Sequence, residues 1–559
     1  MRRAPAPASL ATALAAGLAA LALMPSPAQA AAAPAVSSAQ ATQIASALGL
    51  VHSLERTHPN SFSQVSSPVA GEWQVAFYSR DQEFVQVIVS AASGRVLATY
   101  TGIKIAWSMA RGLPGAFGRH IDALYIWLPL CLLFLAPFFD WRSPLRLRNV
   151  DLLVLTSLSI SLAFFNHADI YQSVPLAYPP LAYLLLRLLW LARPRAPAPA
   201  PLRLNFGPGL LAVGLVALIA FRVALNVADS NVIDVGFANV VGAQKVIDGQ
   251  PLYGQFPGTI ARGDTYGPVA YEAYVPFVAV LGFSGNWDSL PAAHAAAIFF
   301  DLLTIALLLA LGWRIRGPTT GLVLAYAWAA FPFTAFALEC NSNDALVAAL
   351  VTAALLAATS PPARGALAAL AGLTKYAPLS LAPLFATYRL RRAGARGLAV
   401  FALAFAAAAA LALVPALEHN TLATIFSRSV SYQADRSAPF SIWGLYGGLH
   451  WAQRTVQALA VALALGLALQ RREDPIRLAA AAAAILIAVE LGVTYWFYLY
   501  IPWFFAPAAV ALLGGARLEP GLHRRSKRRR GWIVWDGTRG AWLLNRPKSL
   551  LTGGRSQAL

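Results

Sequence analysis

The sequence predicts a polytopic α-helical membrane protein, with about 11–13 transmembrane segments and a small extracytoplasmic α+β domain. The chain has 559 residues, of which 58% are hydrophobic and only 12% charged, a composition far more apolar than that of soluble domains. Apolar stretches of near-membrane length recur along it. The net charge of +19 sits in short basic clusters between these stretches and in a tail. That pattern is typical of cytoplasmic loops in membrane proteins, so we do not expect nucleic-acid binding.

The first residues, 1–30, predict a signal peptide. "MRRAPAPASLATALAAGLAALALMPSPAQA" has a basic start, a short Ala/Leu run and a small-residue ending, so cleavage is expected near Ala30. An uncleaved anchor is the alternative. Either way, the segment that follows is expected outside the cytoplasm.

Residues 38–104 predict the soluble α+β domain. "ATQIASALGLVHSLERTH" has apolar residues at helical spacing, and "EWQVAFYS" and "EFVQVIVSAASGRVLATY" alternate like strands around an "SAASGRV" turn. A helix followed by this strand–"SGRV"–strand hairpin resembles the PepSY domain. The resemblance implies a module that binds or regulates, and the sequence shows no catalytic constellation in it.

Twelve apolar segments follow the first domain. We predict them at 121–139, 150–166, 174–192, 208–226, 292–312, 321–338, 344–359, 364–390, 397–416, 452–469, 478–493 and 496–514. They divide into accessory transmembrane helices at 119–204 and a larger transmembrane domain at 205–515.

The basic clusters predict the orientation of these segments. "WRIRGP", "RLRRAGAR" and "QRREDPIR" all fall on the cytoplasmic side only if the apolar piece 269–283 does not cross the membrane. Segment 364–390 must then pass outward and return, which leaves Lys375 near the outer surface. The tail 516–559 is expected to be a disordered, basic, cytoplasmic segment that contacts anionic lipid.

This orientation gathers the remaining polar stretches on the outer face. They are 227–291, 339–344, the surroundings of Lys375, and 417–450. Asp234 follows a predicted span there, at the start of a helix (Val235, Ala238, Val241, Val246) expected to lie along the membrane surface. A partly desolvated carboxylate in this place suits a general base. A solvated loop acid or a helix cap is the alternative.

Three outer-face cations, His419 and aromatic neighbours suit the binding of an anionic group at the membrane interface. An ammonium such as Lys375 in a Pro-broken apolar segment should have an anionic partner; snorkelling to the headgroups is the alternative. Arg428 and Arg436 lie among aromatic and hydroxyl side chains that include Tyr432 and Trp443, although an interfacial aromatic belt would look the same. His419 suits either phosphate binding or a solvated helix end.

The order of these pieces resembles glycosyltransferase family 87, whose members have the GT-C fold. The matching features are the acid after a span, the helix ending in "DGQPLYG", the "DTYGP" segment, the polar start "ECNSND" and "AGLTKYAPLSLAPLF". The resemblance covers about residues 205–515. It implies an inverting enzyme that transfers mannose or another hexose from a polyprenyl-phosphate donor to a lipid, glycan or protein acceptor, with Asp234 as base and Lys375 and Pro378 in the lysine motif.

The same resemblance implies the remaining site residues. Donor phosphate binding is expected from Lys375, Arg428, Arg436 and His419. Sugar or acceptor contacts are expected from Tyr253, Asp264, Tyr266, Asn343, Asp344, Tyr432 and Trp443. The chain has "YGP" where the family often has "YPP", which leaves the alignment of that loop open.

Other readings of the sequence stay open. Asp169, next to an upstream "YPPL", is an alternative base. A lipid or sugar transporter would need facing charges within the membrane, for which Arg187 and Asp301 are the main candidates, and a non-catalytic PepSY-linked sensor is a third class. No metal or nucleotide motif occurs, and we expect no cofactor. The two cysteines, Cys131 and Cys340, are compatible with a disulfide but do not require one.

Overall fold

The computed structural model describes residues 35–515 except 81, 114–116, 196–201, 288 and 471, and the short strands at 518–519, 533–536 and 541–544. The predicted signal peptide at 1–30 lies outside the described residues, as does most of the tail at 516–559. Within that tail, β7 (Ile533–Asp536) and β8 (Ala541–Leu544) pair antiparallel, which departs from the expected absence of regular structure there.

The N-terminal domain is a four-stranded antiparallel sheet with two helices. Its elements are α2 (Ser38–Ser46), α3 (Gly49–Glu55), β1 (Ser61–Ser66), β2 (Glu72–Ser79), β3 (Gln82–Ser90) and β4 (Val96–Thr101), and the strands lie in the order β1-β2-β3-β4. Ser37 and Gln40 form a capping box that starts α2. The predicted hairpin is β3–β4, with Gly94 at φ +69° in its turn, whereas strand β1 was not predicted.

The rest of the described chain is a helical bundle. Its helices are α4 (Ile103–Ala106), α5 (Leu124–Leu135), α6 (Leu147–Asn166), α7 (Ile170–Ala192), α8 (Pro208–Ala228), α9 (Asp234–Ile247), α10 (Pro268–Glu272), α11 (Val275–Leu281), α12 (Pro291–Arg316), α13 (Pro318–Ala330), α14 (Pro332–Glu339), α15 (Asp344–Leu356), α16 (Pro361–Thr374), α17 (Ala382–Thr387), α18 (Leu390–Leu417), α19 (Leu422–Phe426), α20 (Tyr432–Asp435), α21 (Ile442–Leu445), α22 (His450–Leu469), α23 (Pro475–Gly492) and α24 (Ile501–Ala509). Short 3₁₀ or π turns connect several of them. These include η1 (Ser108–Arg111), η3 (Arg119–Asp122), η5 (Ala377–Leu381), η6 (Ser427–Ser431), η7 (Tyr498–Tyr500) and η8 (Val510–Gly514).

The bundle confirms the predicted fold class. Among the described residues, seven helices are long and apolar enough to cross a membrane, or eight if the bent pair α13–α14 is one span, and five shorter apolar helices accompany them. The apolar piece predicted at 269–283 forms the short helices α10 and α11 and does not belong to the seven. Both thiols, Cys131 and Cys340, are free.

A buried arginine closes the hairpin formed by α16, η5 and α17. Arg364 donates from Nη1 to the Ala358 carbonyl at 2.7 Å and from Nη2 to the Tyr388 carbonyl at 3.0 Å. The segment therefore leaves and re-enters the same end of the bundle, the course predicted from the charge pattern. Lys375 stands at its turn, where the backbone leaves the helix (φ −139°, ψ 139°).

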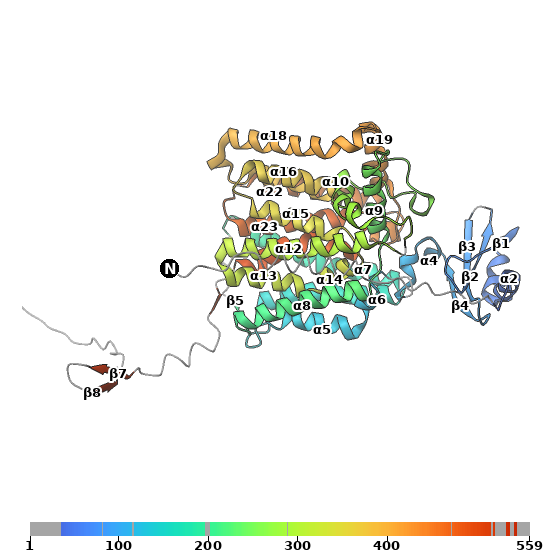
Figure 1. Cartoon of the computed structure of the whole chain (residues 1–559), viewed down its shortest axis with the longest axis horizontal. Helices are drawn as coiled ribbons and strands as arrows, with labels where there is room; N and C mark the ends of the chain where they lie inside the picture. The colour runs from blue at the N-terminus through green and yellow to red at the C-terminus, as the bar shows by residue number, and fades with distance from the viewer. Residues whose placement is uncertain are drawn as a thin grey trace, which may run out of the picture.

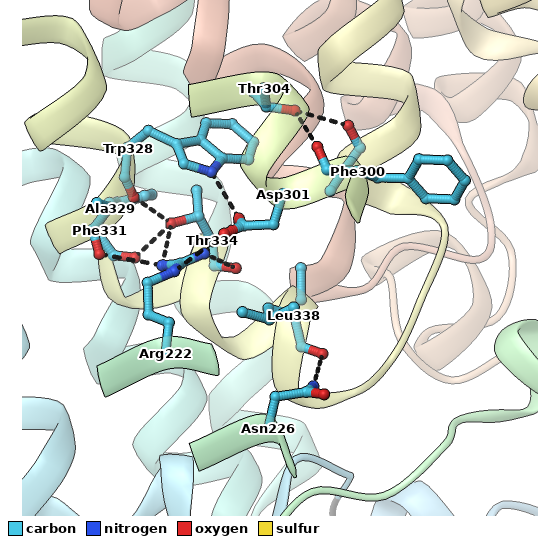
Figure 2. A network of polar contacts seen from close by, with 12 residues as sticks. Arg222, Asn226, Phe300, Asp301, Thr304, Trp328, Ala329, Phe331, Thr334 and Leu338 are labelled. Carbon is cyan, nitrogen blue, oxygen red and sulfur yellow. Dashed lines mark hydrogen bonds and ion pairs between the residues drawn. The ribbon is translucent and has the colours of Figure 1, made fainter. Parts of the chain in front are cut away.

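A second buried arginine fixes the bend of 58° between α13 and α14. Arg222 on α8 forms an ion pair with Asp301 on α12, with 2.5 Å between Nη2 and Oδ1, and donates to the backbone carbonyls of Ala329 and Thr334 (Figure 2). Because Pro332 has no N–H to donate, carbonyls at this break need other donors. Thr334 Oγ1 donates at 2.6 Å to the Trp328 carbonyl that Pro332 leaves without a donor. The Arg222 guanidinium joins α8 to α12, α13 and α14.

One end of the bundle carries the polar loops. Figure 1 shows the N-terminal domain, α4, α9, α10 and α19 at this end, and β5 (Leu202–Arg203) at the opposite end. Helix α9 forms as predicted, but nearly every residue from Val235 to Ala243 is buried. It is thus enclosed by protein, because α10, α11 and α12 pack against it, and it does not have the one open polar face of the amphipathic helix that was expected.

Candidate functional site

A buried ion pair lies at the loop-bearing end of the bundle. Lys375, at the turn after α16, places Nζ 2.5 Å from Oδ1 of Asp344, the first residue of α15. The two side chains are 8% and 0% exposed. The sequence required an anionic partner for Lys375, and the structure identifies it as a residue that had been assigned to sugar contacts.

Aromatic rings enclose this pair. The Lys375 ammonium lies 5.1 Å from the Trp503 ring centroid, 5.3 Å from that of Tyr500 and 5.7 Å from that of Tyr266. Trp503 also donates from Nε1 to Asp344 Oδ1 at 2.9 Å. These faces stabilise the cation where water is scarce, while Asp344 Oδ2 has no hydrogen-bond partner among the described residues.

Asp234 lies within electrostatic reach of the pair. It is the first residue of α9, and its Oδ1 accepts from the Val235 N–H at 2.8 Å. Burial raises the pKa of Asp234, while the charges of Arg436 and Lys375 act to lower it. The side chain keeps part of its surface exposed. A carboxylate that is partly desolvated, accessible and flanked by cations has the properties of a general base.

Arg436 lies against two neighbouring aromatic rings. Its guanidinium carbon lies 4.0 Å from the Tyr495 centroid and 5.4 Å from the centroid of Trp107. None of the ion pairs found among the described residues includes Arg436. A half-buried arginine without a carboxylate partner can bind an external anion.

The loop that carries Tyr266 requires glycine at the next position. A Cβ added to Gly267 would lie 1.9 Å from the Leu373 carbonyl oxygen, closer than any contact allows. This approach presses Tyr266 against the end of α16, beside Lys375. The "YGP" in place of "YPP" is thus explained by backbone contact.

A second group of predicted residues forms the wall of the loop. Asp264 is fully buried and accepts at Oδ2 from Arg428 Nε and from the Gly254 N–H, both at 2.7 Å. Tyr253 is also buried and donates to the Tyr266 carbonyl at 2.9 Å. Their hydrogen bonds hold the loop 253–266 together, and Asp264 neutralises the charge of Arg428.

Three further candidates lie in differing positions. Asn343 is buried beside Asp344, and its side-chain amide has no hydrogen-bond partner among the described residues. The guanidinium carbon of Arg262 lies 5.0 Å from the centroid of the Tyr432 ring. Trp443 donates from Nε1 to the Leu491 carbonyl at 2.8 Å, a bond that ties α21 to the end of α23.

Neither His419 nor Asp169 joins the ion pair. Both residues are exposed, and Asp169 occupies the N-cap position of α7 without a capping hydrogen bond from its side chain. In the described part of the chain, no hydrogen bond or ion pair joins either of them to Lys375 or Arg436.

Sequence reasoning included Tyr266 but missed four other aromatic residues of the site. Tyr495, Tyr500 and Trp503 come from "TYWFYLYIPWFF", where dense aromatic residues at the head of a late apolar segment were the available signal. Trp107 gave no such signal. Among the described residues, no cluster of His, Cys, Asp or Glu suited to a metal ion is present.

Three comparisons with known proteins bear on this site. The sequence model of glycosyltransferase family 87 matches residues 265–494, which include Tyr266, Asp344, Lys375 and Arg436 but not Asp234. No curated protein matches the chain.

Among solved structures, the chain is similar to that described as ArnT from Cupriavidus metallidurans bound to undecaprenyl phosphate. The sequences are 16% identical, the TM-score is 0.38, and the similarity covers 56% of this chain and 60% of that one. The family match supports a membrane glycosyltransferase, and over residues 265–494 the chain is similar to glycosyltransferase family 87.

Proposed function

We propose that this protein transfers a hexose from a polyprenyl-phosphate donor to an acceptor at the extracytoplasmic face of the membrane, with inversion at the anomeric carbon. Mannose is the sugar that the family resemblance favours. The observation that carries the proposal is the meeting of Asp234, Arg436 and the Lys375–Asp344 pair at one end of an apolar bundle. A donor with a prenyl tail would bring its phosphate to such a place.

The site residues suit the two halves of this reaction. Asp234 would take the proton of the acceptor hydroxyl as its oxygen attacks the anomeric carbon. The bond from that carbon to the phosphate oxygen breaks, and the lipid phosphate leaves with an added negative charge, which nearby cations stabilise.

The cations would share this task unequally. Asp344 already neutralises Lys375 at 2.5 Å, so Arg436, which has no ion-pair partner among the described residues, would meet most of the phosphate charge. Asn343 offers a buried amide with unused hydrogen bonds to a sugar hydroxyl. Arg428 and His419 would contribute less, because one is bound to Asp264 and the other is exposed.

The remaining proposals concern location. We propose that the N-terminal domain, whose strand–"SGRV"–strand hairpin resembles PepSY, lies outside the cytoplasm on the same side as the site, as both stand at one end of the bundle (Figure 1). The buried Arg222–Asp301 pair and the partly buried Arg187–Asp151 pair are accounted for as links between helices. They give no reason to prefer a transporter.

The test is transfer and hydrolysis of a labelled donor. Purified protein in nanodiscs would receive polyprenyl-phosphate-mannose, or the glucose or galactose analogue, with and without an acceptor panel. Release of polyprenyl phosphate gives an acceptor-independent readout. We expect Asp234→Asn to lower the rate by roughly 10²–10⁴-fold and Asp169→Asn to leave it unchanged.

Two results would contradict the proposal. Loss of activity in Asp169→Asn with retention in Asp234→Asn would move the base to the α6–α7 turn. A wild-type protein that releases and transfers no sugar from any of these donors would refute the donor class.

A further inference from the structure

The segment that leaves the N-terminal domain reaches into the candidate site. It runs from the end of β4 through α4 and η1, and Trp107 stands between these two turns. The sequence assigned no role to it, and Trp107 lies well before the region matched by the family.

On one side, this segment is fixed to the N-terminal sheet. Arg111 donates from Nη2 to Oε1 of Gln86 on β3 at 2.7 Å and from Nε to the Lys104 carbonyl at 2.8 Å. Its guanidinium also lies 4.1 Å from the centroid of Tyr100 on β4. One arginine thus joins the sheet to the segment.

On the other side, the segment is fixed to the helical bundle. Met109 and Ala110 are buried, and a Cβ added to Gly112 would lie 2.6 Å from the carbonyl oxygen of Asn166 at the end of α6. Trp107 packs edge-to-face on Phe440, with 5.2 Å between the ring centroids. The indole therefore has a defined position against the bundle.

In this position the indole is one of the two aromatic rings that contact the Arg436 guanidinium. Tyr495 supplies one aromatic face at 4.0 Å and Trp107 another at 5.4 Å, and the two rings lie 5.8 Å apart. Both faces attract the guanidinium. Contact with the rings restricts the rotation of the long side chain, and a guanidinium without a carboxylate partner among the described residues can bind an oxyanion.

We propose that Trp107 is a positioning residue for Arg436 and that the N-terminal domain, through Arg111, is a structural part of the donor phosphate site. This inference rests on the proposed function, because it assigns Arg436 to the lipid phosphate. It predicts that the indole acts on donor affinity, while Asp234 acts on the chemical step.

The test compares four variants of the full chain in nanodiscs. Trp107→Leu removes the ring face, Trp107→Phe keeps one, and Arg111→Met releases the segment from the sheet. Trp451→Leu is the matched control, since Trp451 is 84% exposed. KM and kcat are measured with polyprenyl-phosphate-mannose, and the modification rate of Arg436 by phenylglyoxal is followed by mass spectrometry.

We expect Trp107→Leu to raise KM by roughly 2- to 30-fold, the range of a lost cation–π contact, with little change in kcat and faster modification of Arg436. Trp107→Phe should bring KM and the modification rate of Arg436 most of the way back to wild-type values. Arg111→Met should raise KM and the modification rate as Trp107→Leu does. Trp451→Leu should match wild type. Unchanged KM and modification rate in Trp107→Leu, or equal defects in the Leu and Phe variants, would overturn the role of Trp107. Wild-type values in Arg111→Met would overturn the role of the domain.

The two proposals fail differently. If the wild type uses no polyprenyl-phosphate sugar, the proposed function is wrong. The modification rate of Arg436 still decides whether Trp107 holds the guanidinium.

Discussion

Replacing Asp344 by asparagine should test the energetics of the buried ion pair. Asparagine keeps the shape of the side chain and its bond from Trp503, but it removes the charge that faces Lys375. With 2.5 Å between Nζ and Oδ1, the lost attraction is roughly 7 kcal/mol at an effective dielectric constant of about 20. Part of this is offset because the Asp344 carboxylate no longer has to be desolvated, whereas the Lys375 charge stays buried, so we expect a net loss of about 3–5 kcal/mol in stability.

The matched control is an ion pair of the same length at the surface. Arg392 and Glu473 lie 2.6 Å apart, with side chains 65% and 44% exposed, against 8% and 0% for Lys375 and Asp344. Glu473→Gln should therefore cost only about 0–1 kcal/mol. Burial, and not distance, is then the variable that the comparison isolates.

Thermal and denaturant unfolding in detergent would measure both variants. The double variant Lys375→Met/Asp344→Leu should be more stable than the sum of its single effects predicts, because it leaves no uncompensated charge. Equal losses in Asp344→Asn and Glu473→Gln, or strict additivity in the double variant, would refute the reasoning.

Three more predictions follow from the site and its supports. Arg436→Gln should move the acid limb of the pH profile of kcat/KM to higher pH, because Arg436 lowers the pKa of Asp234 against the larger effect of burial; an unmoved or lowered limb would contradict this. Gly267→Ala should abolish activity, since its Cβ would lie 1.9 Å from the Leu373 carbonyl oxygen; an active, stable variant would show that the loop can move. Arg364→Met should lower the free energy of unfolding by roughly 2–6 kcal/mol, because it strands two buried carbonyls at about 1–3 kcal/mol each; thermal melts would measure this, and a loss below about 1 kcal/mol would mean that other donors replace the guanidinium.

The sequence was most informative where the membrane constrains the chain. Continuous apolar runs can only be buried or face lipid, so the helices lie close to their predicted ranges, and the basic clusters predicted the return of the chain around Lys375. It was less informative for α9. The spacing of Val235 and Val241 marked one apolar face, but Gly236 and Gly242 allow other segments to pack closely on the remaining faces. A Cβ added to either would lie 2.4 or 2.2 Å from an atom of the neighbouring segment.

The candidate site shows the same division. Asp234, Lys375 and Arg436 could each be identified as site candidates. A charged residue at the edge of an apolar segment needs an oppositely charged partner or has a function. Which residue meets which depends on contacts between separate helices and loops, 31 positions apart for Asp344 and Lys375 and 164 for Asp264 and Arg428. Arg428 and Asp264 were both expected to face substrate, and the structure pairs them with each other.

By itself, the sequence determined a helical membrane protein with a small α+β domain, and the kinds of side chain that gather at its polar loops. Hydrophobic periodicity and charge bias are local properties of a chain, and they are sufficient to predict the fold class and the composition of the loops. Only the tertiary structure decided that Asp344 neutralises Lys375, that late aromatic residues enclose them, and that Trp107 of the leading segment lies against Arg436. Packing of distant segments sets these distances, and no pattern within a single segment records them.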